Sequence, residues 1–148
     1  MTWRIGEILV RKRLISWEQL EECLNEQNKT REMTGEILIK KGYISAQLFY
    51  MALADQYGLK FVDLRRAHVN PKAIERVPRS VAEKYLLIPL EIMKDTLIIG
   101  ISNPMKVLPE EELGKLSGLP RIQSVLCMPT QILHAITEHY PTPSSQQN

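Results

Sequence analysis

Three polar side chains in the first 56 residues of the chain have the types and spacing that could bind an anionic ligand. Arg4 directly precedes Ile5-Gly6, near a predicted helix start where free backbone N–H groups can approach an anion. Gln27 and Gln56 lie in line with apolar positions of predicted helices, where a buried amide needs hydrogen-bond partners. Charge and amide groups in this setting favour binding chemistry.

The stretch that must position these side chains runs from Arg4 to Gln56 and contains one unit in two copies. A shift of 29 residues places Gly6-Glu7-Ile8-Leu9 on Gly35-Glu36-Ile37-Leu38. The same shift pairs Val10/Ile39, Lys12/Lys41, Ile15/Ile44, Ser16/Ser45, Leu20/Phe49, Leu24/Leu53 and Gln27/Gln56. We expect each copy to be one supersecondary unit that needs a neighbour to bury its apolar face.

Apolar spacing predicts that each copy is an αα-hairpin and that the two hairpins pack together. The expected helices cover about 2–13, 17–27, 35–41 and 46–56. A polar connector is expected at 28–32. Ser16 is an expected N-cap with Gln19 completing a capping box, Ser45 caps the last helix, and Gly42 suits a left-handed turn.

Two interpretations of this duplication remain open from the pattern alone. In one, the matching glycines let helices approach closely and the repeat is a small structural core. In the other, the same geometry is offered twice to a ligand that itself has two similar halves. Periodicity favours the first interpretation, and the placement of Arg4, Gln27 and Gln56 favours the second.

The sequence contains no recognisable phosphate-binding loop. Its only Gly-Lys pair is Gly114-Lys115. Pro109 stands where a Walker-type loop requires glycine, and Leu116 stands where it requires Ser or Thr. We therefore expect no nucleotide hydrolysis by this chain.

Other candidate catalytic or metal-binding groups have ordinary structural explanations. His134, Glu138 and His139 share the last predicted helix, but zinc needs three or four converging ligands, and no other His or Cys is close in sequence. The run Glu110–Glu112 falls in the first turn of a predicted helix, where acidic side chains interact favourably with the helix dipole. We expect no enzyme activity, no metal and no cofactor.

The hydrophobic period changes after residue 58. Two apolar, β-branched runs, 86–91 and 96–102, are separated by Met93-Lys94-Asp95 and predict a hairpin. A short extended segment is expected at 61–64, a third strand at 121–128, and helices at 71–77, 80–85, 109–117 and from Pro129 onward. The predicted class is α+β, with a duplicated helical module at 1–58, a small α/β sandwich module with a roughly three-stranded sheet at 59–140, and a linker-like tail at 141–148.

Composition is ordinary for a soluble cytoplasmic protein. The 148 residues are 44% hydrophobic and 24% charged, with a net charge of +2, so no strong field toward nucleic acid or membrane is expected. No apolar run reaches the roughly 18–20 residues that span a bilayer, and the N-terminus lacks the features of a signal peptide. Cys23 and Cys127 lie far apart in apolar patterns, as reduced core thiols do.

The duplicated stretch resembles the two 24-residue motifs of the MshEN-type cyclic-di-GMP-binding domain. This domain occurs at the N-terminus of type II secretion and type IV pilus assembly ATPases. The first copy matches through Arg4-Ile5-Gly6-x-x-Leu9, Leu20, Leu24 and Gln27, and the second through Gly35-x-x-Leu38, Phe49, Leu53 and Gln56. The second half is similar through Leu87-Ile88-Pro89, the strand followed by Asn103-Pro104, and the helix from Ile136 to Tyr140, so the resemblance covers about 3–140.

The resemblance implies binding of a bacterial second messenger that has two guanines and two phosphates. In the family, apolar side chains embrace the ligand while the motif Arg and Gln supply polar contacts. Arg4 would contact a phosphate or a guanine edge, the glutamines would donate amide hydrogen bonds, and the glycines would allow backbone approach. The implied ligand-binding residues are Arg4, Ile5, Gly6, Leu9, Leu20, Leu24, Gln27, Met33, Thr34, Gly35, Leu38, Phe49, Leu53 and Gln56.

The second copy departs from the family pattern at its start. Met33-Thr34-Gly35 stands where Arg-Leu-Gly is expected, so one cationic contact is missing. Loss of a charge-assisted hydrogen bond costs about 1.5–3 kcal/mol, or about 10- to 150-fold in affinity. Arg31 is a candidate substitute from the connector. Arg13 stands where the first motif usually has Gly.

The leading expectation is a non-catalytic cyclic-di-GMP-binding regulatory domain of a bacterial type II secretion or type IV pilus system. The alternative is a docking module that attaches a secretion or pilus ATPase to its inner-membrane platform protein, with nucleotide binding weak or lost. Met33 and Thr34 favour this alternative. Both place the chain in the cytoplasm, at the inner membrane only through a protein partner. The absent ATPase core predicts a free-standing form or a fragment ending in a linker.

Overall fold

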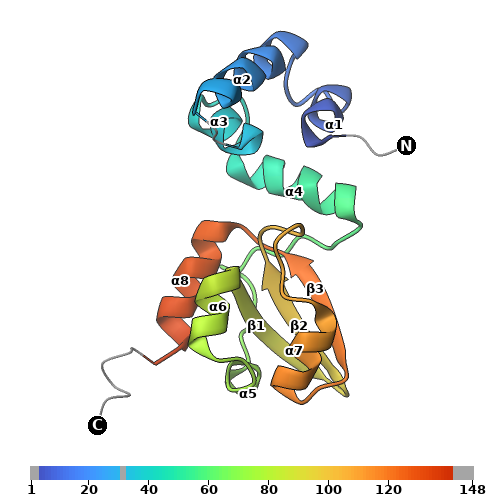
Figure 1. Ribbon diagram of the computed structural model, residues 1–148, viewed down its shortest axis with the longest axis vertical. Coiled ribbons are helices and arrows are strands. Elements are labelled where there is room, and N and C mark those ends of the chain that lie inside the picture. The colour runs from blue at the N-terminus through green and yellow to red at the C-terminus, as the bar shows by residue number, and fades with distance from the viewer. Residues whose placement is uncertain (1–3, 31–32, 142–148) are drawn as a thin grey trace. The chain divides into compact units, whose positions relative to one another are not determined.

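The computed structural model describes residues 4–30 and 33–141, which form two compact units that divide between Gly58 and Leu59 (Figure 1). The helices of the described residues are α1 (Ile5–Arg11), α2 (Trp17–Thr30), α3 (Thr34–Lys40), α4 (Ala46–Tyr57), α5 (Pro71–Ile74), α6 (Arg79–Tyr85), α7 (Glu110–Ser117) and α8 (Pro129–His139). The strands are β1 (Leu87–Met93), β2 (Thr96–Ile101) and β3 (Arg121–Leu126). The predicted α+β class is confirmed.

Two helices of the first unit begin at the predicted caps. Gln19 N donates to Ser16 Oγ at 3.1 Å, and Ser16 N donates to Gln19 Oε1 at 2.9 Å, which is a complete capping box at the start of α2. Leu48 N donates to Ser45 Oγ at 3.1 Å at the start of α4. Gly58 ends α4 with a left-handed backbone at φ +66°.

The second helix is longer than predicted. It was expected to end at Gln27, but α2 continues to Thr30, whose Oγ1 donates to Glu26 O at 3.1 Å. Residues 28–30 are exposed, and polar side chains on the outer face of a helix need no apolar partner. The predicted connector at 28–32 is therefore wrong for its first part, and positions 31–32 lie outside the described residues.

Both copies of the repeat turn through a left-handed residue at the same position. Gly42 has φ +77°, and Arg13, which precedes it by 29 residues, has φ +61°. Their backbone hydrogen bonds are equivalent too, because Arg13 N donates to Val10 O at 2.9 Å and Gly42 N donates to Ile39 O at 3.0 Å. The turn geometry is thus conserved between the copies although arginine suits it less well than glycine.

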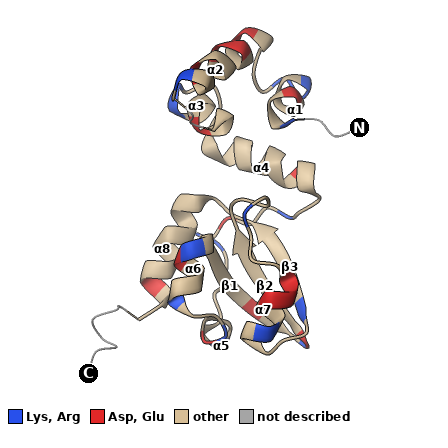
Figure 2. Ribbon diagram, viewed as in Figure 1, with Lys and Arg blue, Asp and Glu red and all other residues tan. Residues whose placement is uncertain are grey.

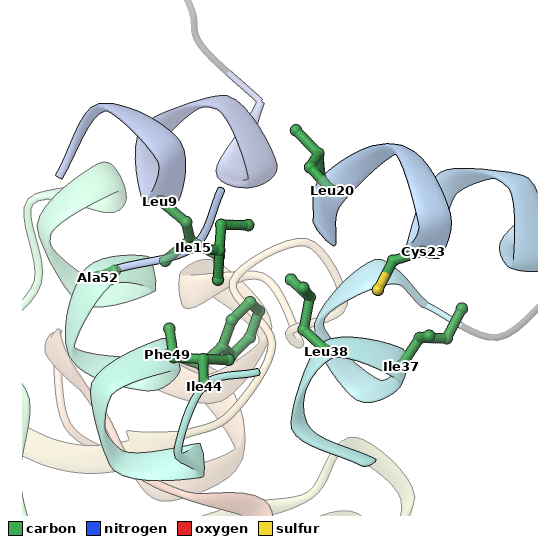
Figure 3. Packing of buried hydrophobic residues seen from close by; sticks show 9 residues of the cluster. All are labelled: Leu9, Ile15, Leu20, Cys23, Ile37, Leu38, Ile44, Phe49 and Ala52. Carbon is green, nitrogen blue, oxygen red and sulfur yellow. The ribbon is translucent and has the colours of Figure 1, made fainter. Parts of the chain in front are cut away.

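One apolar core serves both copies of the repeat. Its buried residues are Leu9, Ile15, Leu20, Cys23, Ile37, Leu38, Ile44, Phe49 and Ala52. Eight of the nine form repeat pairs, namely Leu9/Leu38, Ile15/Ile44, Leu20/Phe49 and Cys23/Ala52. Figure 3 shows side chains from all four helices of the unit gathered in this cluster. Each copy therefore buries its apolar face against the other, as expected for a repeat unit.

The second unit is built on a sheet with the order β1-β2-β3. β1 and β2 form the predicted antiparallel hairpin, in which Met93 pairs with Thr96 across a turn whose first residue, Lys94, has φ +57°. β3 runs parallel to β2, with Arg121 opposite Thr96, and α7 lies in the connection between them. Such a connection is needed because parallel neighbours cannot be joined by a tight turn.

The helices of the second unit cover its sheet. α5, α6 and α8 pack on β1, α8 also packs on β2, and α7 packs on β3 (Figure 1). Tyr140 at the end of α8 donates its hydroxyl to Val77 O at 2.8 Å. α5 ends at Ile74, earlier than predicted. The predicted extended segment at 61–64 is present at its start, where Phe61 forms an isolated parallel bridge with Leu126.

Candidate functional site

The helices of the first unit pack mainly across the two copies of the repeat. α1 packs on α4, and α2 packs on α3. Lys12 Nζ lies 3.1 Å from Asp55 Oδ2, and Lys41 Nζ lies 3.1 Å from Glu26 Oε2. Lys12 and Lys41 are repeat equivalents, and so are Glu26 and Asp55, because each pair stands 29 residues apart. Each ion pair therefore joins the lysine of one copy to the acid of the other, so the two copies contact each other in an approximately symmetric way.

This packing places the start of each copy beside the second helix of the other copy. Thr34, the first residue of α3, shows the arrangement directly, because its Oγ1 donates to Oε1 of Gln27 on α2 at 2.7 Å. The repeat equivalents of Thr34 and Gln27 are Ile5 and Gln56, on the other pair of packed helices, α1 and α4. Each polar end of the predicted site therefore combines residues of both copies.

Eight of the predicted ligand-binding residues have accessible surface, and we group them into two half-sites according to the packing of α1 on α4 and of α2 on α3. The first half-site consists of Arg4, Ile5, Leu53 and Gln56. The second half-site consists of Leu24, Gln27, Met33 and Thr34. Met33 is 59% exposed, Leu24 is 39% exposed and Arg4 is exposed, whereas the other five are half-buried.

The other six predicted residues are buried within the unit. They are Gly6, Leu9, Leu20, Gly35, Leu38 and Phe49. Leu9 and Leu38 have no exposed surface, and Leu20 and Phe49 are only 3% and 7% exposed. These side chains belong to the shared core shown in Figure 3, so in this structure they support the half-sites from inside.

Gly6 and Gly35 each have a packing role. A Cβ atom on Gly6 would lie 2.5 Å from Leu20 Cδ1, and a Cβ atom on Gly35 would lie 2.2 Å from Phe49 Cζ. Both distances are far below the roughly 3.5–4.0 Å of a favourable carbon–carbon contact. Each glycine therefore lets the second helix of its own copy lie against the first. At Gly6 and Gly35, therefore, the repeated glycine is explained by close helix packing within each copy.

The two half-sites differ in charge. Arg4 brings a guanidinium to the first half-site, whereas its repeat equivalent in the second half-site is the thioether of Met33. The candidate substitute, Arg31, lies outside the described residues. The first half-site can therefore pair with an anion through Arg4, while the second offers an apolar side chain at the same position.

Charged groups reinforce the helix pair that carries the second half-site. Lys41 Nζ lies between Glu22, at 3.6 Å, and Glu26, at 3.1 Å, and the Tyr43 hydroxyl donates to Glu22. The hydrogen bond from Tyr43 is the main cause that lowers the pKa of Glu22, and the hydrogen bond with Glu26 is the main cause that raises the pKa of Lys41. α2 and α3 are thus joined by ion pairs as well as by apolar packing.

This cross-copy arrangement was not predicted from the sequence. The repeat pairs Lys12 with Lys41 but does not by itself connect either lysine to an acid. A signal was present, because Glu26 and Asp55 also stand 29 residues apart and both carry a carboxylate. These repeated positions would allow equivalent ion pairs either within each copy or between the copies, and the structure shows the pairs between the copies.

Other charged and reactive groups do not form a second site. His134 Nδ1 lies 3.7 Å from Glu138 Oε2 on exposed surface of α8, and residues 4–30 and 33–141 contain no group of three or more His, Cys, Asp or Glu that could hold a metal ion. The Cys127 thiol is buried, which raises its pKa to about 12 and keeps it protonated.

Figure 2 shows both acidic and basic residues on each unit. Glu110, Glu111 and Glu112 lie in the first turn of α7. Within the described parts of the chain, no helix has the length and apolar character needed to cross a membrane.

The fold defines an α+β domain of two units, the first of which consists of duplicated helical hairpins. The family model described as the MshEN domain matches residues 57–146, which is more than half of the chain. The chain belongs to the MshEN domain family. The matched residues lie almost entirely in the second unit, and the predicted ligand-binding residues lie in the first.

Two solved structures extend the similarity to the duplicated helices. The structure of MshE with cdg matches 93% of this chain and 99% of that chain, with a TM-score of 0.83 and 30% sequence identity. A structure of the N-terminal domain of XpsE matches 93% of this chain and 94% of that chain, with a TM-score of 0.66 and 17% identity, which shows the fold alone. Matches of this extent include both units.

Curated relatives are much longer than this chain. The type IV pilus assembly ATPase PilB of Myxococcus xanthus is 34% identical over 140 residues, which is 95% of this chain and 25% of that protein. PilB of Thermus thermophilus is 37% identical over 102 residues, and bacteriophage adsorption protein B of Escherichia coli is 27% identical over 136 residues. The chain spans 11% and 18% of these two proteins, so it corresponds to a quarter or less of each relative.

Proposed function

We propose that this chain is a cyclic-di-GMP-binding regulatory domain of a type IV pilus or type II secretion system, and that it acts by binding and not by catalysis. The observation that supports this most is the similarity to MshE with cdg over nearly the whole of both chains. The ligand has two similar halves, and the duplicated helices offer two similar half-sites. The proposal places the domain in the cytoplasm.

In this proposal each half-site takes one half of the ligand. Arg4 pairs with an anionic or acceptor group, since a guanidinium can form two parallel hydrogen bonds with such a group. Leu24 and Leu53, at equivalent positions of α2 and α4, cover apolar faces of the nucleotide. Gln27 and Gln56 supply amide hydrogen bonds. The buried core residues keep the two half-sites at a fixed separation.

Calorimetric titration with cyclic-di-GMP tests the proposal. We expect saturable binding by the wild type and at least about 10-fold weaker binding by Arg4→Ala, because a hydrogen bond to a charged group contributes about 1.5–3 kcal/mol. Arg66→Ala removes an exposed arginine from the second unit and serves as the matched control, with unchanged affinity. Absence of heat at high micromolar nucleotide would overturn the proposal.

A docking function is the second candidate, and the exposed apolar side chains of the first unit favour it. Met33 is 59% exposed where the first copy has Arg4, and Leu48 and Met51 on α4 are 44% and 41% exposed. A protein partner, such as the cytoplasmic domain of an inner-membrane platform protein, would cover such a surface. Gel filtration of the chain with that domain should show a complex that Met33→Glu weakens. Two separate peaks for the wild type would argue against docking.

A further inference from the structure

The strand β3 lies at one edge of the sheet, with β2 on its inner side (Figure 1). Arg121 N donates to Asp95 O at 3.3 Å at the start of this pairing. Cys127 N donates to Ile101 O at 2.8 Å at its end. The odd-numbered residues of β3 therefore direct their backbone groups toward β2, and in a regular parallel ladder the even-numbered residues direct theirs outward.

Three residues of β3, namely Ile122, Ser124 and Leu126, thus present a backbone N–H and a backbone C=O to the outside. Leu126 N donates to Lys60 O at 2.8 Å, and Val62 N donates to Leu126 O at 2.9 Å. Ile122 and Ser124 are half-buried, and their outward backbone groups have no hydrogen-bond partner among residues 4–30 and 33–141. Two donors and two acceptors of the strand are therefore unpaired within the described chain.

The opposite edge of the sheet is protected against such pairing. β1 contains Pro89, which has no N–H, and its pairing with β2 is shifted between Pro89 and Glu91. Asn70 N donates to Leu90 O at 2.8 Å, and α5 packs on β1. Proline, bulges and covering segments prevent an edge from pairing with another strand. The stretch Arg121–Ser124, here called the open edge, contains neither proline nor glycine and pairs with β2 in unbroken register.

The open edge fits a short extended segment of polypeptide, because only an extended backbone presents N–H and C=O groups at the spacing of a strand. This chain already shows the mode of binding, since residues 60–62 add to the same edge beside Leu126 in parallel orientation. Those residues limit the open edge at one end, and Pro120, which lacks an N–H, limits it at the other. About four residues of a partner fit between these limits, whereas a stable interface between two folded proteins uses about 20–30 residues a side.

Cations stand at both ends of the open edge. The Arg121 side chain is 76% exposed, and its Nε lies 3.6 Å from Asp95 Oδ2, which leaves the terminal nitrogens of the guanidinium for another partner. Lys60 is exposed and has no ion-pair partner among the described residues. An acidic residue near either end of a bound segment would meet one of these cations, and a basic residue would be repelled.

We propose that the open edge of β3 is a docking site for a short, extended, acidic segment of a partner protein, which adds to the sheet as a further strand. The backbone of the segment bonds to Ile122 and Ser124, and its acidic side chains pair with Arg121 and Lys60. The site lies in the second unit, so the inference goes beyond the proposed nucleotide binding by the first unit and does not depend on it.

Amide NMR of the full chain with a synthetic peptide tests the proposal. The probe is acetyl-Glu-Val-Thr-Val-Glu-amide, whose β-branched residues favour the extended form and whose acids can reach both ends of the open edge. We expect saturable shifts of the Ile122 and Ser124 amides with a Kd on the order of 1 mM, the size of four typical backbone hydrogen bonds.

Two altered peptides separate backbone pairing from charge. A peptide N-methylated at its three central residues keeps the side chains but loses the backbone donors, and it should bind at least about tenfold more weakly. A peptide with Gln in place of both Glu keeps the backbone and should bind about twofold to fivefold more weakly, since exposed ion pairs contribute little.

Two variants at one position test the site on the protein. Ser124→Pro removes an outward N–H without breaking the ladder to β2, and Ser124→Ala keeps that N–H. We expect Ser124→Pro to weaken binding of the probe by about threefold to tenfold and Ser124→Ala to leave it unchanged. Unchanged amide shifts in β1 show that each variant is folded. If Ser124→Pro does not fold, the comparison of the peptides on the wild type still decides.

The outcomes are distinct. Equal binding of the N-methylated peptide, no response of Ile122 and Ser124 at several times the expected Kd, or unchanged affinity in a folded Ser124→Pro variant would overturn the docking site. Equal binding of the glutamine peptide would overturn its preference for an acidic segment. Sedimentation that shows a dimer of the wild type, abolished by Ser124→Pro, would assign the edge to a second copy of the chain and also overturn the proposal. Failure of cyclic-di-GMP to bind changes none of these results.

Discussion

Replacing Gly35 with alanine tests how tightly the two helices of one copy pack. The new Cβ atom would lie 2.2, 2.6 and 2.8 Å from three ring atoms of Phe49. Phe49 is 7% exposed and is surrounded by the shared core, so its ring has little room to move. The matched variant is Gly6→Ala, at the equivalent position of the first copy, where the nearest atom is the Cδ1 methyl of Leu20 at 2.5 Å.

The expected cost follows from the nature of each obstacle. Overpacking a core costs about 1–3 kcal/mol, and exchange of glycine for alanine in a helix returns up to about 1 kcal/mol. A rigid ring cannot turn away from three contacts, so we expect Gly35→Ala to lower the free energy of unfolding by about 2 kcal/mol. A leucine methyl can move by side-chain rotation. For Gly6→Ala we expect a loss of about 0–1 kcal/mol.

Urea denaturation followed by tryptophan fluorescence measures these losses in the appropriate unit. Both tryptophans of the chain, at positions 3 and 17, belong to the first unit by sequence, so the signal reports its unfolding separately from that of the second unit. The midpoint should fall for Gly35→Ala with an unchanged dependence on urea, since the surface exposed by unfolding is nearly the same.

A double variant provides the decisive comparison. Phe49→Leu makes the second copy resemble the first, which has Leu20 opposite its glycine. In the Phe49→Leu background, Gly35→Ala should therefore cost about 1 kcal/mol less than it does alone. If Gly35→Ala costs no more than Gly6→Ala, or if its cost is the same in both backgrounds, the ring of Phe49 is not the reason for glycine at this position.

Two further predictions concern backbone strain and acid stability. Arg13→Gly should raise the free energy of unfolding by about 0.5–1 kcal/mol, because arginine at φ +61° bears a cost that glycine avoids. Gly42→Ala should lower the free energy of unfolding for the same reason, since no atom lies within 4 Å of its new Cβ and only the backbone conformation opposes the change. Denaturation of the first unit measures both variants, and midpoints equal to that of the wild type would contradict this expectation. Arg65→Met should raise the pKa of Asp63, which lies well below its ordinary value chiefly because the Arg65 side chain donates to the carboxylate at 2.8 and 3.1 Å. Since the folded-state pKa is lowered, the ionised carboxylate stabilises the fold above the ordinary pKa of about 3.9, and this contribution is lost as the pH falls toward the folded-state pKa. A carboxyl titration by NMR checks the shift, and an unchanged Asp63 pKa in the variant would refute it.

The local features of this protein were predictable from the sequence because short-range interactions decide them. The Ser16–Gln19 capping box needs only four neighbouring residues, and the hairpin between 87 and 101 needs two apolar runs and a short turn. The 29-residue repeat is likewise visible without coordinates. Even here, local patterns placed the end of α2 too early, because polar residues at 28–30 are compatible with both a connector and an exposed helix end.

The division of the predicted ligand-binding residues depended on contacts between segments that are distant in sequence. The repeat shows Leu9 and Leu24 as equally apolar, yet Leu9 is fully buried and Leu24 is 39% exposed, because Leu9 joins the core shared by both copies. Periodicity reveals that a helix has an apolar face, but not how much of that face a second copy covers.

By itself, the sequence determined the repeat, the α+β class, the caps and the candidate residues, all of which follow from local patterns. Only the tertiary structure decided that α1 packs on α4 and α2 on α3, since this arrangement depends on apolar contacts between segments distant in sequence, with an accessible ion pair on each helix pair. That packing brings Thr34 to Gln27 and builds each half-site from both copies. A one-dimensional pattern can identify two equal copies, but only their packing shows which side chains meet.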